Sequence, residues 1–148
     1  MRRGESELVI EARQQTYYAA LMAQACVKGG QTEQADSVLT KELERVRDTG
    51  VRYYAPELYR IKGEVLLRHS ASSRKQAETY FHTAIDLSHA QGAKSLELRA
   101  IMSLSDLWQK QRKKEEARQL LQDIYGWFTE GFDTADLKWA KQLLNVVS

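Results

Sequence analysis

Apolar residues recur every three or four positions along most of the chain, which is the periodicity of amphipathic helices. The pattern predicts seven helices, at about residues 8–28, 32–49, 54–69, 73–91, 93–111, 115–128 and 134–147. Glycines and short polar segments separate them, and Gly92 is expected to end the fourth helix as its C-cap. Val and Ile are sparse and do not alternate with polar residues at period two. We therefore predict an all-α fold.

The first predicted helix has an apolar stripe that we expect to face the core. Its members, spaced three or four residues apart, are Tyr18, Leu21, Met22, Ala25 and Cys26. Cys26 is the single cysteine, and its apolar surroundings favour a buried small side chain over a nucleophile. Residues 1–6 are interpreted as a flexible terminus or a remnant of cloning, and residues 7–148 as one domain.

The stretch from Ala77 to Gly92 carries the clearest side-chain pattern. Ala77, Phe81 and Ala84 share one helical face, and a small–large–small face suits a helix that lies very close to its neighbour. Weaker copies begin 42 residues earlier, at Ala35, and 40 residues later, at Ala117. Each interval holds two predicted helices and a turn, which is typical of a helix–turn–helix solenoid.

This pattern resembles the tetratricopeptide repeat, in which small residues mark helix crossings and a large residue lies between them. The period is longer than the usual ~34 residues, and Glu42 and Ile124 replace the second small residue in the outer copies. The resemblance implies a right-handed α–α superhelix of three helix pairs, at about residues 8–50, 51–92 and 93–131, closed by a capping helix at about 134–147. The matching structural positions are Ala23, Ala35, Leu39, Gly63, Ala77, Phe81, Ala84, Trp108, Ala117 and Leu121.

A second resemblance covers residues 91–100, 107–108, 115–121 and 125–144, including the unusual segment Gly-Trp-Phe-Thr-Glu-Gly-Phe-Asp-Thr. These residues are similar to the C-terminal end of large bacterial predicted ATPases, some of which carry an adenylate/guanylate cyclase or DNA-binding domain at the N-terminus. The resemblance implies a regulatory or sensor module of a bacterial signalling protein. The catalytic parts of that family lie outside these residues.

Composition narrows the function classes. The 22 basic and 20 acidic residues are interspersed and give a net charge of +2, so the clustered basic surface of a nucleic-acid-binding protein is not expected. No run of about 18 apolar residues predicts a membrane span. With a single cysteine and no secretory signal pattern, a cytoplasmic location is expected.

Catalytic and metal-binding patterns are missing from the sequence. His82 and His89 could share a helical face but lack a nearby third ligand. The segment from Gly92 to Ser95 is similar to the end of a phosphate-binding loop, but it lacks the earlier glycine and the preceding strand. We therefore expect no enzymatic activity, no cofactor and no metal.

The expected binding surface is the concave face lined by the first helix of each pair. On that face we place Tyr17, Gln24, Lys28, Arg60, Glu64, Arg68, Arg99, Asp106 and Lys110. The set leans basic and suits an acidic peptide or a helix with carboxylates. We predict a non-catalytic scaffold that binds a protein, a peptide or another domain of its parent polypeptide. Two alternatives stay open: a module that self-associates, for example as a homodimer, and a sensor of a small-molecule effector.

Overall fold

The computed structural model describes residues 2–147, and all regular secondary structure in that range is helical. Seven α-helices and one short 3-10 helix follow one another: α1 (Arg2–Lys28), α2 (Thr32–Thr49), α3 (Ala55–His69), η1 (Ala71–Ser73), α4 (Arg74–Gln91), α5 (Lys94–Lys110), α6 (Lys114–Tyr125) and α7 (Ala135–Val147). The all-α prediction is confirmed. The first helix begins at Arg2 instead of near Leu8, so the residues set aside as a terminus continue it from Arg2 onwards.

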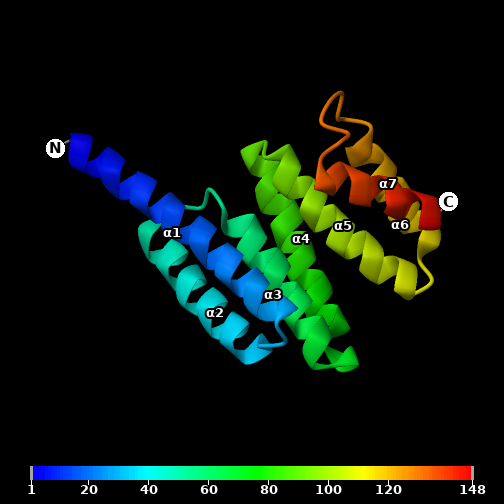
Figure 1. The fold of residues 1–148 in the computed structure, drawn as a ribbon, viewed down its shortest axis with the longest axis horizontal. Coiled ribbons are helices and arrows are strands. Elements are labelled where there is room, and N and C mark those ends of the chain that lie inside the picture. The colour runs from blue at the N-terminus through cyan, green and yellow to red at the C-terminus, as the bar shows by residue number, and fades with distance from the viewer. Residues whose placement is uncertain (1, 148) are drawn as a thin grey trace.

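The helices pack one after another in the order of the chain (Figure 1). Each α-helix contacts the next one, and the odd-numbered helices also contact each other in the steps α1–α3, α3–α5 and α5–α7. Within residues 2–147, the even-numbered helices have no such contacts with one another. The odd-numbered helices therefore form one continuous inner layer, which the even-numbered helices cover from one side.

Glycine residues end two of the helices. Gly50 and Gly92 end α2 and α4 with φ of 72° and 68°, a left-handed conformation that residues with a Cβ rarely adopt. The Gly92 C-cap is thus confirmed. The sixth helix is shorter than predicted: it ends at Tyr125, because Gly126 is a poor helix former and the N–H of Trp127 donates to Ile124 in a tighter turn.

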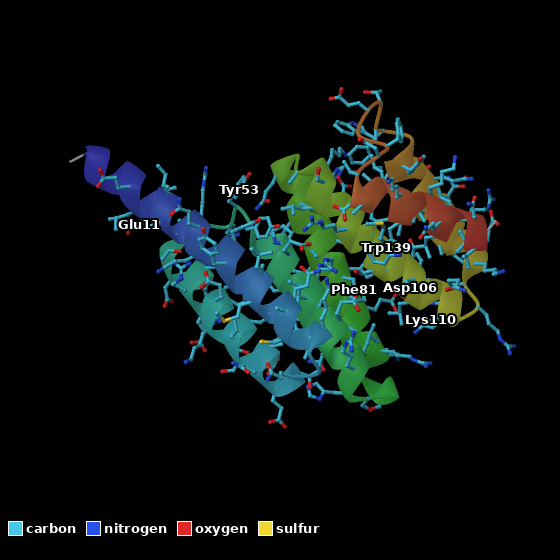
Figure 2. The ribbon with its side chains drawn as sticks, viewed as in Figure 1. Glu11, Tyr53, Phe81, Asp106, Lys110 and Trp139 are labelled. Carbon is cyan, nitrogen blue, oxygen red and sulfur yellow. The ribbon has the colours of Figure 1, made fainter. Side chains whose placement is uncertain are left out.

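The small–large–small positions lie at the centre of the core. Phe81, which Figure 2 labels in the middle of the molecule, has no exposed surface. A Cβ added at Gly63 of α3 would lie only 2.5 Å from Cε1 of that ring, so glycine is what allows α3 to approach α4 so closely. Fully buried as well are Ala35, Leu39, Ala77, Ala84, Ala117 and Leu121. Trp108 is half-buried, and its Nε1–H donates to Glu78 Oε1 over 3.0 Å.

The two departures from the repeat pattern have local explanations. Glu42 is buried, but the Thr16 hydroxyl of α1 lies 2.9 Å from its Oε2 and Arg45 forms an ion pair with it. Ile124 replaces an alanine where α7 covers the end of the stack, and it packs in a cluster with Leu137 and Ala140.

The predicted core face of the first helix is wrong. Tyr18, Leu21 and Met22 are 65%, 45% and 55% exposed, Ala25 is exposed too, and Cys26 alone of that stripe is buried. The helix instead buries a face that shares only Cys26 with the predicted stripe and consists of Ala12, Thr16, Ala20, Ala23, Cys26 and Val27. The physical reason is size: the small residues of this face let α2 and α3 come close, while the larger side chains point outwards.

Candidate functional site

A groove of about 380 Å³ lies on the inner layer, between the odd-numbered helices. Its lining comes from the end of α1, the length of α3, and single residues of α5 and α7: Gln24, Val27, Lys28, Arg60, Ile61, Glu64, Arg68, Asp106 and Trp139. Six of the nine residues that the sequence places on the concave face line it, namely Gln24, Lys28, Arg60, Glu64, Arg68 and Asp106. The structure thus brings these six side chains to one surface.

The groove has an apolar floor and an aromatic wall. Val27 and Ile61 are almost fully buried at its base. Trp139 of α7 is 40% exposed, and Figure 2 shows it near Asp106 of α5. The sequence reasoning missed Trp139, because α7 was considered only as a cap. Its position after three helix pairs was the available signal, since a single following helix takes the place of the next first helix in the inner layer.

The charged side chains of the groove that have no ion-pair partner among the described residues are mainly basic. Lys28 and Arg68 are exposed and form no ion pair with any residue that the structure describes. Asp106 is neutralised by Lys110, whose Nζ lies 3.0 Å from Oδ2. Glu64 is half-buried and acts electrostatically on Arg60. Two cationic side chains at one end of the groove are therefore available to an acidic ligand.

Arg60 and Arg99 are engaged inside the molecule instead. The carboxylate of Glu57, which is 2% exposed, accepts hydrogen bonds from Arg60 Nε at 2.8 Å and from Arg99 Nη1 at 3.2 Å. Arg99 Nε donates to Asp136 Oδ2 over 2.8 Å, and Arg60 Nη1 reaches Ser103 Oγ at 3.4 Å. This ion network joins α3, α5 and α7.

The environment keeps the network charged. Burial by itself would lower the pKa of Arg60, but the charge and hydrogen bonds of Glu57 raise that pKa above its usual value. Burial alone would also lower the pKa of Arg99, but the hydrogen bond to Asp136 and the charge of Glu57 raise that pKa above its usual value. Arg60 is only 7% exposed. The geometry therefore gives Arg60 and Arg99 a structural role, which the sequence did not predict.

The two other predicted residues lie beside the groove. Tyr17 is exposed and packs edge-on against Tyr54, with ring centroids 5.3 Å apart. The Tyr54 hydroxyl lies 3.4 Å from Arg99 Nη1, so this aromatic pair borders the ion network. Lys110 is exposed at the end of α5 and touches the groove only through its pair with Asp106.

The histidines and acidic residues of the described part of the chain do not come together in one cluster. Among the described residues, no group of three or more His, Cys, Asp or Glu side chains could hold a metal ion. His82 and His89 each face a separate acid, Glu78 at 3.6 Å and Glu97 at 3.1 Å. Of the helices in residues 2–147, none is both long enough and apolar enough to cross a membrane.

The chain matches no protein-family model, and comparison with curated proteins and with solved structures yields no match either.

Proposed function

We propose that this chain is a non-catalytic interaction module whose inner groove binds a protein segment rich in carboxylates. The observation behind the proposal is the combination of Lys28 and Arg68, which are unpaired within the described residues, with the half-exposed ring of Trp139 beside an apolar floor. A guanidinium binds a carboxylate through two parallel hydrogen bonds. Tryptophan and arginine are also the residues that most often dominate the energetics of protein interfaces.

We further propose that the stacked pairs form a right-handed superhelix of the tetratricopeptide type, closed by α7. The two-layer packing, the buried small–large–small positions and the close approach of Gly63 to Phe81 support it. In such a superhelix the first helices line the concave face and offer a preformed groove. The groove is lined by residues of α1, α3, α5 and α7, which are the helices that would line the concave face on this proposal.

For the biological setting, we propose a regulatory module of a cytoplasmic bacterial signalling ATPase. Its support is the resemblance of residues 91–100, 107–108, 115–121 and 125–144 to the end of such proteins. The ligand of the groove would then be a sister domain of the same polypeptide or a segment of a partner protein. Either one would present aspartates or glutamates next to an apolar side chain.

Selection of peptides from a random display library on the purified chain tests the groove. We expect the selected peptides to be enriched in acidic residues and to contain an apolar anchor. Calorimetry should then show that Arg68→Glu and Trp139→Ala each weaken binding about tenfold or more, because one removes a charge pair and the other the aromatic wall.

The matched control is Arg47→Glu, an exposed arginine on α2 in the other layer. It carries the same charge reversal away from the groove and should bind the peptides like the wild type. Circular dichroism should be identical for all three variants. The proposed site would be contradicted if Arg68→Glu and Arg47→Glu lost the same amount of peptide affinity. It would also be contradicted if neither Arg68→Glu nor Trp139→Ala lowered the affinity for the peptides.

A further inference from the structure

The outward face of α1 is apolar, and no other described element covers it. Tyr18, Leu21 and Met22 are exposed there, together with Ala25. Contiguous apolar residues on the surface of a helix mark an interaction surface more often than chance. The face lies opposite the small residues that α1 buries against α2 and α3.

The same positions are buried one repeat later. The α3 residues 40 positions after Tyr18, Leu21 and Ala25 are Leu58, Ile61 and Val65. All three are at most 2% exposed and belong to the core cluster shared with α1 and α2. Ala23 and Gly63, the small residues of the two helices, have the same separation and anchor this register. The outward face of α1 is therefore of the kind that this fold otherwise covers with a further helix.

This face is also complementary to itself in the antiparallel direction. Six exposed residues follow one another at steps of three and four, the spacing of a helix–helix seam: Glu11, Gln14, Tyr18, Leu21, Ala25 and Lys28. If a second copy of the helix runs in the opposite direction, the acidic end of the seam meets the basic end. The same arrangement places Tyr18 against Leu21 in the middle.

The charges at both ends are free to form this pair. Glu11 and Lys28 are exposed and have no ion-pair partner in the described part of the chain. Figure 2 shows Glu11 on the N-terminal half of α1, and Figure 1 shows that this end of the helix projects past α2. The acidic end is thus accessible to a second molecule.

We propose that two copies of this chain form a homodimer through the outward faces of α1, antiparallel and around a twofold axis between Tyr18 and Leu21. In this dimer Glu11 of each copy pairs with Lys28 of the other, and Tyr18 packs on Leu21. A twofold axis makes every contact occur twice. We favour a second copy over an unrelated helix because this face itself carries both members of each charged pair, Glu11 and Lys28, at positions that meet in an antiparallel arrangement.

Sedimentation equilibrium of the purified chain across the micromolar range tests the dimer. The wild type should reach twice the 17.0 kDa mass of one chain. Leu21→Glu should stay monomeric, because it places two carboxylates in the apolar centre of the interface. Val146→Glu is the control: Val146 is a similarly exposed apolar residue, but on α7, and its substitution should leave the dimer intact.

Charge exchange tests the antiparallel register. Glu11→Lys and Lys28→Glu should each raise the dissociation constant of the dimer about tenfold, since each replaces two attractive pairs with two repulsive ones. The double variant Glu11→Lys/Lys28→Glu should restore the wild-type value. The proposal would be overturned if the wild type were monomeric, if the dimer survived Leu21→Glu, or if Val146→Glu abolished it. It would also be overturned if the double variant did not restore the dimer affinity that each single charge variant loses.

Discussion

Gly63 and Phe81 show how one pair of residues sets the distance between two helices. The ring is fully buried, and the glycine lies against its edge with no room for a methyl group. Phe81 is identified in the sequence by its alanine neighbours at helical spacing, and Gly63 by the resemblance to the tetratricopeptide repeat. The contact between them could not be read from the sequence, since the two residues belong to different helices.

We expect Gly63→Ala to destabilise the fold although alanine favours helix by ~1 kcal/mol over glycine. The new Cβ would lie 2.5 Å from the buried ring, and forcing the two helices apart costs about 1–3 kcal/mol. Gly29→Ala is the matched control, because its Cβ would meet only ordinary contacts at 3.5 Å or more. Urea denaturation measures both. Equal stability of the two variants would show that the helices are not in such close contact.

We expect the environment of Tyr54 to make the folded state less stable at high pH. Burial, and then the charge of Glu57, raise the pKa of the Tyr54 hydroxyl above its ordinary value of 10.0, and the opposing effect of Arg99 is smaller. The folded state therefore holds this proton more tightly than the unfolded state. The resulting stability is complete below pH 10.0 and is lost as the pH rises through the folded pKa.

Denaturation as a function of pH, in parallel with the absorbance of the phenolate, measures this effect. Tyr54→Phe should make the decline in stability above pH 10.0 shallower. Tyr53→Phe, at an exposed neighbouring ring, should leave the decline as in the wild type. Identical pH dependence in the two variants would contradict the raised pKa of Tyr54.

At the scale of elements, α1 shows that hydrophobic periodicity alone does not determine which face of a helix is buried. Both faces of this helix are apolar, one with small residues and one with larger ones, and the larger residues dominate any hydrophobic pattern. Which face is buried depends on how closely α2 and α3 approach, and that is a property of tertiary packing. The ends of the helices were more predictable, because Gly50 and Gly92 adopt left-handed conformations there.

The ion network is the element-scale feature that the sequence could not reveal. Glu57 and Arg60 are three residues apart, but Arg99 and Asp136 come from other helices far along the chain. Only the stacking of α3, α5 and α7 brings them together. The sequence therefore contained no sign that donors of Arg60 and Arg99 bind Glu57, Ser103 and Asp136.

Glu57→Ala should cost about 3–5 kcal/mol of unfolding free energy, because it leaves two guanidinium groups in and beside the core without their carboxylate. Chemical denaturation compares it with Glu115→Ala, which removes the acid of a solvent-exposed pair with Arg118 and should leave stability unchanged. If the two substitutions had equal effects, the network would not hold α3, α5 and α7 together.

For the whole molecule, the repeat explains how much of the groove could be predicted. Helices that recur at about 40 residues present the same face to the inner layer, so positions as distant as Gln24, Glu64 and Asp106 could be assigned to one surface. The aromatic wall was missed because Trp139 belongs to the last, unpaired helix. The proposed groove and the proposed dimer face of α1 meet at Lys28. In the dimer Lys28 would pair with Glu11 of the second copy, and Arg68 would remain as the groove cation for a carboxylate-rich ligand.

Amide chemical-shift mapping with a peptide selected on the wild-type chain tests the central claim most directly. The proposed groove predicts the largest shifts at Gln24, Glu64 and Arg68 and at the indole N–H of Trp139, and their loss when the peptide's acidic residues are replaced by amides. Shifts concentrated on α2 and α4, or binding that is indifferent to the peptide's charge, would contradict it.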